Sequence, residues 1–281
     1  MKRCLACERR FEAQAWRCPA CGFAPQSALG FPAFAPAVEA GYDPSRYEAV
    51  ARAEAGHFWF RSRAVLIAWA LRRHFPLAQS LLEIGCGTGH VLASLKESSS
   101  IPRIAGSEAH PEGLAFAARR ATGAELLQMD ARRIPFRDEF DVVAAFDVIE
   151  HIEEDEQVLA EMFAACRAGG GVLLTVPQHS WLWSVRDEFA GHRRRYGRAE
   201  LLRKLARAGF VRAWATSFVS LLLPLMALSR RRRQFSPSGE LEIGAAVNRL
   251  LGGLMALERT LIAAGLRLPA GGSLLVAAHK P

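Results

Sequence analysis

The sequence predicts an α/β fold, because short apolar strands alternate with helical segments and four of the strands end at an acidic residue. The first of these strands contains Leu82-Glu83-Ile84 and runs into Gly85-Cys86-Gly87-Thr88-Gly89. Glycines here allow backbone angles closed to other residues and let main-chain amides approach a ligand closely. Residues 91–95 are expected to form the helix that follows. This order of strand, glycine loop and helix predicts a cofactor site at the carboxyl end of the strand.

Three further strand ends carry acids. Glu108 ends a strand over residues 103–107, about 20 residues after the glycine loop, the offset at which an acid reaches ribose hydroxyls. Asp130 ends a strand over residues 125–129, and the strand over residues 140–146 runs into Asp147. The alternative is that the glycines only make a tight turn and the acids only cap helices. Four strand ends that each carry an acid favour a single ligand site over four unrelated turns and helix caps.

This pattern resembles the class I S-adenosylmethionine-dependent methyltransferases of the type 11 and type 12 kind, over roughly residues 46–280. The resemblance implies a Rossmann-like sheet of seven strands. It also implies that the glycine loop meets the methionine portion of S-adenosylmethionine, Glu108 takes the ribose hydroxyls, Asp130 faces the adenine amino group, and Asp147 lines the methyl-transfer side. The closely spaced glycines favour this cofactor over a nicotinamide, whose fingerprint spaces its glycines more widely. The expected cofactor-binding residues are Glu83, Gly85, Cys86, Gly87, Gly89, Glu108, Asp130, Ala131 and Asp147.

A second motif lies at the N-terminus, where two Cys-x-x-Cys pairs can each present two thiolates to one metal ion. Two disulfides are the alternative, and a reducing cytoplasm argues against them. We expect a zinc ribbon over residues 1–24 whose zinc is structural, because four protein ligands leave no open coordination position. Its ligands are Cys4, Cys7, Cys18 and Cys21. The remaining cysteines, Cys86 on the glycine loop and Cys166 on a predicted helix, are expected to be buried thiols.

Residues 25–45 are rich in proline and glycine, so they predict a linker between a tethered zinc ribbon and a methyltransferase domain over residues 46–281. The aromatic segment that follows could be core packing alone. Helices placed before the core cover the cofactor in many methyltransferases of this kind. The resemblance therefore also allows a lid that contains His57, Trp59 and Arg61.

The segment over residues 178–196 follows the fifth predicted strand and carries an unusual density of polar and aromatic side chains. Ligands of a parallel sheet bind outside the carboxyl ends of its strands, so we expect this segment to hold the methyl acceptor. The arginines could clamp a phosphate or a carboxylate, or could form a solvated basic face. The expected acceptor-binding residues are His179, Trp181, Trp183, Arg193, Arg194, Arg195 and Tyr196.

Methyl transfer depends on alignment of the nucleophile with the methyl group, and a hydroxyl acceptor must also lose its proton. His192 and His151 are the candidate bases, since imidazole titrates in the useful range, and Asp147 lies beside them. Helix capping or supporting hydrogen bonds are the alternative roles for both histidines. Asp147, Glu150 and His151 also resemble a hard-metal cluster, although a clear fourth ligand is absent from the pattern.

An insertion over residues 219–272 separates the sixth predicted strand, residues 210–218, from a seventh, residues 273–279, which the resemblance places antiparallel at the sheet edge. Apolar residues stand beside Arg230 to Arg233, a composition that suits an interfacial helix over residues 219–233. A proline interrupts the apolar run, which falls short of a membrane span. A second helix, residues 240–264, is expected to place one apolar face inward as a helical cap on the core. This face comprises Ile243, Val247, Leu250, Leu254, Leu257 and Leu261.

Composition agrees with an enzyme of this kind: 281 residues, 51% hydrophobic, with a formal net charge of +8 concentrated in arginine clusters. No signal-peptide pattern follows Met1, so we expect a cytoplasmic protein, with peripheral contact at the inner membrane surface as an option. The predicted activity is O-methylation of a small-molecule or lipid-linked acceptor. An RNA methyltransferase is the main rival, because zinc ribbons often touch nucleic acid. A non-catalytic adaptor that binds S-adenosylmethionine is a third class.

Overall fold

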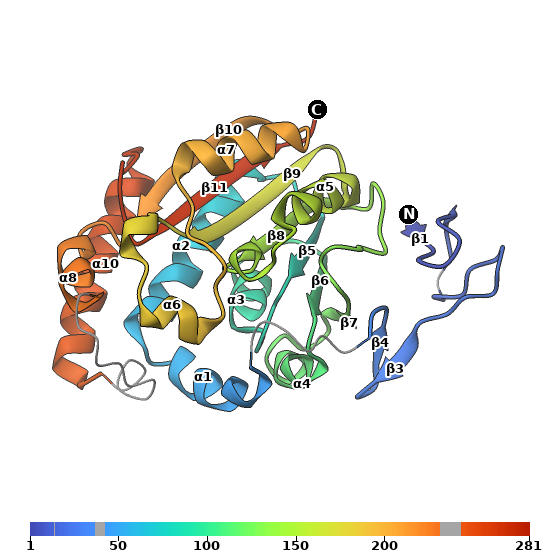
Figure 1. Ribbon diagram of the computed structural model, residues 1–281, viewed down its shortest axis with the longest axis horizontal. Coiled ribbons are helices and arrows are strands. Elements are labelled where there is room, and N and C mark those ends of the chain that lie inside the picture. The colour runs from blue at the N-terminus through green and yellow to red at the C-terminus, as the bar shows by residue number, and fades with distance from the viewer. Residues whose placement is uncertain (14, 37–42, 231–242) are drawn as a thin grey trace.

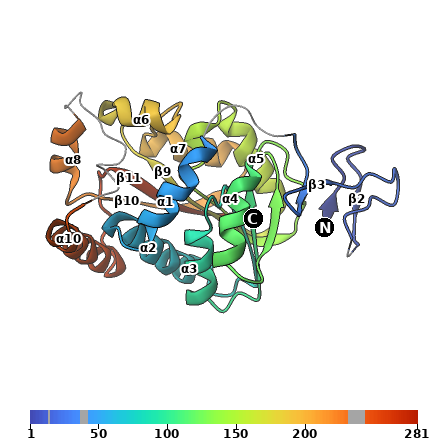
Figure 2. The same ribbon diagram turned by 90° about the horizontal axis from the view of Figure 1, so that it is seen from below.

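A nine-stranded, mostly parallel sheet with helices on both faces forms the centre of the described chain (Figure 1 and Figure 2). The computed structural model describes residues 1–13, 15–36, 43–230 and 243–281. Its strands are β1 (Lys2–Arg3), β2 (Arg10–Phe11), β3 (Gln26–Ala28), β4 (Phe31–Ala33), β5 (Ser80–Ile84), β6 (Arg103–Glu108), β7 (Glu125–Gln128), β8 (Phe140–Phe146), β9 (Cys166–Pro177), β10 (Val211–Phe218) and β11 (Ser273–His279). Its helices are α1 (Tyr47–Glu54), α2 (Phe58–His74), α3 (His90–Ser98), α4 (Pro111–Arg120), α5 (Asp155–Ala165), α6 (Val185–Ala190), α7 (Arg198–Arg207), α8 (Leu223–Arg230) and α10 (Ala245–Ala263), with 3₁₀ turns η1 (Pro44–Arg46), η2 (Ile149–His151) and η3 (Ser180–Leu182).

The sheet order β10-β11-β9-β8-β5-β6-β7-β4-β3 confirms the predicted α/β, Rossmann-like class. Strand β5 pairs in parallel with β6 on one side and with β8 on the other. The strand order reverses at β5 and β8, and a crevice opens outside the carboxyl ends of strands at such a reversal. The glycine loop leaves β5 at this point.

One detail of the predicted topology is wrong. Strand β11 does not lie at the sheet edge, because it pairs antiparallel with β9 and with β10. Strand β10 is therefore the edge strand. Every residue of β11 except His279 is buried, as two pairing neighbours and covered faces require.

Alternate residues of the central strands pack on opposite faces of the sheet. Leu81 belongs to the cluster that joins α2, α3, α4 and α10, whereas Leu82 belongs to the cluster that joins α5 and α7. Strands buried on both faces read as nearly continuous apolar runs, which is why residues 140–146 contain a single charged residue.

The predicted linker differs from the structure. Residues 26–33 form the hairpin β3–β4, and β4 extends the sheet by pairing with β7 at Ala33 and Gln128. The cysteine-containing segment also contacts the main domain: Arg3 Nη1 lies 2.8 Å from Glu161 Oε2, and the Trp16 and Phe136 ring centroids are 5.2 Å apart. These contacts fix the N-terminal segment against the sheet, whereas composition alone predicted a tether. Residues 37–42 of the predicted linker lie outside the described residues.

The insertion is anchored by a buried carboxylate. Glu258 of α10 accepts hydrogen bonds from the backbone N–H groups at positions 219, 220 and 221, at 2.6, 2.6 and 2.8 Å. Met255 and Ile262 pack on the core beside it, so α10 is the expected cap. The face predicted to point inward differs, however, because Leu250 is 66% exposed and Leu257 is 52% exposed.

Among the described residues, no helix has both the length and the apolarity needed to cross a bilayer. The start of the second predicted insertion helix, residues 240–242, and the basic residues Arg231 to Arg233 lie outside the described residues. The cysteine-containing segment and the pair α8 and α10 lie at opposite ends of the molecule in both views (Figure 1 and Figure 2).

Candidate active site

A cavity of about 410 Å³ lies at the carboxyl ends of β5, β6, β7 and β8. This volume lies within the usual range for small-molecule and cofactor sites. Every expected cofactor-binding residue except Gly89 lines it, and so do Tyr47, Val50, Glu54, Arg63, His151 and Arg193. The structure thus brings the four acidic strand ends to one place.

Two glycines of the loop occupy positions that other residues would strain. Gly85 has φ +67°, and a Cβ there would lie 2.5 Å from Val148 Cγ2. Gly89 has φ +77°, and its Cβ would lie 2.6 Å from Ala117 Cα on α4. Gly85 therefore shapes the cavity, whereas Gly89 lets α3 and α4 pack closely behind it.

Glu108 holds the glycine loop from the neighbouring strand. Its Oε2 accepts from the Gly87 N–H at 2.9 Å, and its Oε1 accepts from the Ala109 N–H at 2.7 Å. Burial raises the pKa of Glu108, although these backbone donors oppose the shift. The carboxylate is thus positioned by main-chain donors at the place where an acid can meet hydroxyl groups.

Glu83 at the end of β5 is 2% exposed, and no described residue hydrogen-bonds its Oε2. Burial, with a further contribution from Glu108, raises the pKa of Glu83 to about 8 against the opposing effect of Arg63. An orphaned carboxyl oxygen in a cavity wall is a group that a ligand donor would satisfy. Glu83 therefore fits a cationic or N–H-bearing part of a cofactor.

Asp130 and Ala131, which follow β7, also line the cavity. Burial works to raise the pKa of Asp130, but the Arg132 guanidinium, 2.7 Å from Asp130 Oδ2, outweighs it and lowers that pKa. Asp130 therefore accepts hydrogen bonds as a charged group.

Residues 82–174 match the family model described as a methyltransferase domain. The chain carries a class I S-adenosylmethionine-dependent methyltransferase domain. The match begins in β5 and ends in β9, so it spans the strands that build the cavity. The resemblance on the glycine loop and the acidic strand ends is confirmed.

Individual relatives cover smaller parts of the chain. A phosphatidylethanolamine N-methyltransferase of Cereibacter sphaeroides is 38% identical over 101 residues, which cover 34% of this chain and 48% of that protein. A dTDP-3-amino-3,6-dideoxy-alpha-D-glucopyranose N,N-dimethyltransferase of Streptomyces fradiae is 34% identical over 121 residues, 42% of this chain and 47% of the other. The chain spans between 47% and 60% of the length of the curated relatives that it matches.

The methyltransferase fold is also seen in a solved structure of the [4+2]-cyclase SpnF. The two chains are 18% identical with a TM-score of 0.57, over 88% of this chain and 99% of that one. This likeness concerns the fold alone, since one fold supports several chemistries. The chemistry of this methyltransferase domain must therefore be argued from its own side chains.

Asp147, which follows β8 and lines the cavity, is held in a left-handed backbone conformation with φ +57°. Arg63 Nη2 lies 2.6 Å from its Oδ2, and the Thr175 hydroxyl donates to Oδ2 at 3.1 Å. Arg63 also donates to the Phe146 carbonyl at 2.8 Å. Sequence reasoning missed Arg63, although an arginine that precedes the apolar run of a helix was a usable signal.

The helices before β5 do line the cavity, but with other residues than expected. Tyr47, Val50 and Glu54 of α1 line it, whereas His57, Trp59 and Arg61 do not. His57 instead caps α2, since its Nδ1 accepts from the Trp59 N–H at 3.2 Å. The predicted lid segment therefore begins about ten residues earlier.

The two candidate bases lie side by side, with the His151 and His192 ring centroids 4.8 Å apart. His151 lines the cavity, whereas His192 is not part of the cavity lining. His192 Nδ1 lies 3.0 Å from Asp187 Oδ1. Burial works to raise the pKa of Asp187, but His192, Arg195 and Arg230 lower it to about 2. The ionised carboxylate favours a proton on His192 Nδ1, which leaves Nε2 with its lone pair.

His151 is perturbed by its surroundings, because burial, followed by the neighbouring imidazole of His192, lowers its pKa to about 4. It is thus a neutral imidazole over the physiological range and a weak base. Of the two predicted bases, His192 has the supporting geometry for proton transfer.

Three of the seven expected acceptor residues pair with the buried acids Asp155 and Asp187. Arg194 Nη1 pairs with Asp155 Oδ1 at 3.1 Å, Arg195 Nε pairs with Asp187 Oδ1 at 2.7 Å, and the buried Tyr196 hydroxyl donates to Asp155 at 2.7 Å. Arg193 alone of the expected set lines the cavity. A clamp by three arginines is not formed, because the charges of Arg194 and Arg195 are already neutralised.

His179, Trp181 and Trp183 lie in or next to the 3₁₀ turn η3 and do not line the cavity. His179 and Trp181 are in contact, with ring centroids 5.5 Å apart, and Trp181 is 61% exposed. These aromatic groups could meet only the part of an acceptor that extends beyond the cavity.

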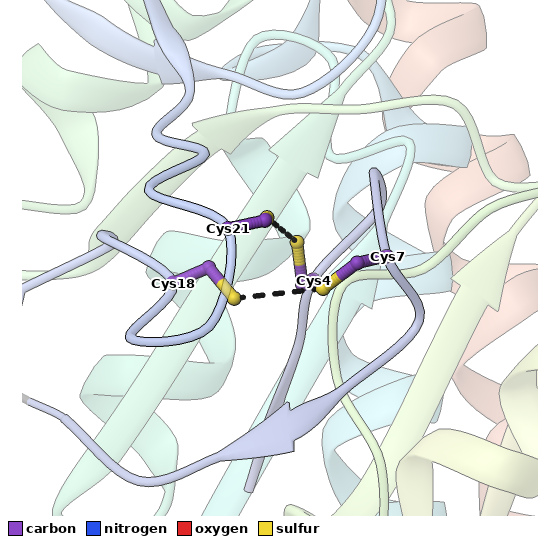
Figure 3. Close-up of side chains that lie close together, drawn as sticks. All are labelled: Cys4, Cys7, Cys18 and Cys21. Atoms are coloured by element: carbon purple, nitrogen blue, oxygen red, sulfur yellow. Dashed lines mark hydrogen bonds between the residues drawn. The ribbon is translucent and has the colours of Figure 1, made fainter.

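The four N-terminal cysteines converge as predicted (Figure 3). Cys4 Sγ lies 3.5 Å from Cys21 Sγ and Cys7 Sγ lies 3.7 Å from Cys18 Sγ, with all four sulfurs within 4.8 Å of one another. These distances are too long for disulfide bonds of about 2.05 Å. Hydrogen bonds from Glu8 N to Cys4 O and from Gly22 N to Cys18 O close the two turns that present the thiols.

Proposed function

We propose that the protein transfers a methyl group from S-adenosylmethionine to an oxygen atom of a small-molecule or lipid-linked acceptor. The observation that carries this proposal is one cavity in which the glycine loop and the acids Glu83, Glu108, Asp130 and Asp147 meet the acceptor-side groups His151 and Arg193. When bound, S-adenosylmethionine supplies an electrophilic methyl group on a positively charged sulfur.

The four acidic strand ends would each face a different part of the cofactor. Glu108 would accept from the ribose hydroxyls, Asp130 would face the adenine amino group, and the orphaned Glu83 would receive the cationic amino acid end. Asp147, fixed by Arg63, would line the place where the methyl group is transferred. Positioning of this kind supplies much of the acceleration of a direct displacement.

His192 would activate the acceptor. Asp187 orients the imidazole through Nδ1, so that Nε2 can take a proton from a hydroxyl group. Arg193 would attract a negatively charged part of the acceptor, since it is the arginine of its cluster that lines the cavity.

Methylation of an amine nitrogen is the second candidate, and the names of the relatives favour it. The proteins from Cereibacter sphaeroides and Streptomyces fradiae are named as N-methyltransferases, one of a phospholipid and one of an amino sugar nucleotide. An ammonium acceptor must also lose a proton, so the same His192 would serve it. The identity of the product distinguishes the two candidates.

An exposed apolar face supports a lipid-linked acceptor. Leu225 and Leu228 of α8 and Val247, Leu250 and Leu257 of α10 are each more than half exposed. Spacings of three and seven residues place them in stripes along the helices. Exposed Arg249 and the arginines that follow α8 in the sequence would attract anionic headgroups, so we propose that this face contacts an anionic lipid surface.

Lipid binding can be tested by sedimentation of the full chain with vesicles of phosphatidylglycerol or of phosphatidylcholine. We expect binding to the anionic vesicles and at least a fivefold loss in Leu250→Glu. The matched control is Leu77→Glu, which changes an exposed leucine before β5 and should bind like the unaltered protein. Equal binding by both variants would contradict a role for this face.

We also propose that Cys4, Cys7, Cys18 and Cys21 hold one structural zinc ion. Four sulfurs at about 2.3 Å from a tetrahedral zinc lie roughly 3.8 Å apart, close to the separations seen here. The site has four thiolates and lies away from the cavity, so this zinc would stabilise the N-terminal segment and take no part in methyl transfer.

The proposed activity can be tested by incubating the purified chain with methyl-labelled S-adenosylmethionine and separate lipid, small-molecule and RNA fractions. We expect label in the lipid or small-molecule fraction and equimolar S-adenosylhomocysteine, with fragmentation mass spectrometry locating the methyl group on oxygen or nitrogen. Label confined to RNA would overturn the acceptor class. Binding without turnover in every fraction would favour a non-catalytic adaptor.

A further inference from the structure

Three side chains beside the cavity form a cluster that proton transfer by His192 alone does not explain. Glu150, His151 and His192 each offer a ligand atom, and these atoms lie within 4.8 Å of one another. Glu150 and His151 come from η2 after β8, whereas His192 comes from the segment after α6. A backbone hydrogen bond from Arg193 N to Glu150 O, 2.7 Å long, holds the two segments together.

The carboxylate of Glu150 is the unusual member. Its side chain is completely buried, and neither Oε1 nor Oε2 has a hydrogen-bond partner in the part of the chain that the structure describes. Burial, together with nearby Asp147, raises the pKa of Glu150 well above its ordinary value. A buried carboxyl group with two unsatisfied oxygens is costly, and a cation held beside it would remove that cost.

The two histidines supply lone pairs beside this carboxylate. His151 Nδ1 is buried without a partner among the described residues. His192 Nδ1 is bonded to Asp187, which leaves Nε2 for a ligand. A carboxylate that orients a histidine through its second nitrogen is the usual support of a metal ligand.

We propose that Glu150, His151 and His192 bind a divalent first-row transition metal ion at the acceptor end of the cavity. Two imidazoles and one carboxylate suit such an ion better than they suit Mg²⁺, which prefers oxygen ligands. The ligand set differs from the predicted hard-metal cluster by one residue. Asp147 is paired with Arg63, and His192 replaces it beside Glu150 and His151.

This inference rests on the proposed function and alters the role of His192 from direct proton acceptor to metal ligand. Three protein ligands leave coordination positions open for water or for an acceptor oxygen. An ion in this place would stabilise the deprotonated form of an acceptor hydroxyl, whose proton passes to solvent.

The test is titration of the full chain with Mn²⁺ in the absence of S-adenosylmethionine and acceptor, followed by the loss of the free-ion signal in electron paramagnetic resonance. Mn²⁺ is the probe because it disfavours the thiolates of the N-terminal cluster. We expect one saturable site per chain and at least a tenfold weaker affinity in Glu150→Gln and in His192→Ala. His179→Ala, a matched histidine outside the cluster, should bind Mn²⁺ like the unaltered chain.

Glu150→Gln preserves the shape and size of the buried side chain, so its fold should be retained, and circular dichroism checks this for each variant. If one variant fails to fold, the other decides the test. Saturable binding that survives both substitutions would overturn the site, and so would the absence of saturable Mn²⁺ and Co²⁺ binding to the zinc-loaded chain. Because no turnover is measured, these outcomes are independent of whether methyl transfer is found.

Discussion

Replacing Glu108 by alanine removes the carboxylate that links β6 to the glycine loop. In the structure this group accepts from Gly87 N at 2.9 Å and from Ala109 N at 2.7 Å, and it would also accept from the ribose hydroxyls. Hydrogen bonds to a charged group contribute about 1.5 to 3 kcal/mol each, but the burial that raises the pKa of Glu108 offsets part of this. We therefore expect Glu108→Ala to weaken S-adenosylmethionine binding by about 1 to 3 kcal/mol, or roughly 5- to 150-fold in Kd.

Isothermal titration calorimetry measures this loss directly. Glu108→Gln should lose less, because its amide oxygen can still accept one hydrogen bond. Glu125→Ala is the matched control, since Glu125 lies on the adjacent strand β7, pairs with Arg103 and does not line the cavity. If folded Glu108→Ala bound S-adenosylmethionine as tightly as Glu125→Ala does, the assignment of the ribose contact would be refuted.

Three further predictions concern the zinc, the acceptor and pH. Elemental analysis should find one equivalent of zinc in the unaltered chain, and Cys18→Ser should lose this zinc while the main domain stays folded. The control Cys166→Ser should keep the zinc. Absence of zinc from the unaltered chain would contradict the site. His192→Ala should reduce kcat/KM by about 100-fold with S-adenosylmethionine affinity unchanged, and a loss of cofactor affinity instead would place this segment in the cofactor site. Burial raises the pKa of Glu83 to about 8 from an ordinary 4.5, so its contribution to stability is complete below pH 4.5 and is lost as pH rises through 8. Glu83→Gln should remove this dependence, on the order of 2 to 4 kcal/mol between pH 4.5 and pH 9 by urea unfolding, and parallel pH profiles would show that the shift is absent.

The acidic strand ends could be predicted because each depends on local sequence. An apolar run that ends at an acid places that acid at the carboxyl edge of the sheet wherever the strand lies. Glu83, Glu108, Asp130 and Asp147 all follow this rule, and all four line the cavity. Parallel pairing then brings them together without further information.

The acceptor side could not be predicted in the same way, because it depends on which side chains neutralise one another. Arg194 and Arg195 look like anion-binding groups in the sequence, but Asp155 and Asp187 neutralise them in the fold. These acids lie on α5 and α6, and nothing in the local sequence indicates the pairing. Arg63 is the converse case, a residue of an early helix that reaches Asp147 across the core.

The N-terminal segment is a further case in which the sequence did not predict the structure. Proline and glycine content agrees with the absence of helix over the described residues 25–36, but it did not reveal that β4 would extend the sheet beside β7. Addition of a short edge strand requires one neighbour with unpaired backbone groups, and its sequence can be almost arbitrary. Composition therefore predicted a tether where the structure has a docked hairpin.

Direct binding of S-adenosylmethionine to the full chain tests the central claim most simply. Calorimetry should find one site per chain, with S-adenosylhomocysteine competing for it and NADH leaving it unaffected. Absence of saturable binding, or displacement of S-adenosylmethionine by NADH, would contradict the assignment of the cavity and with it the proposed methyl transfer.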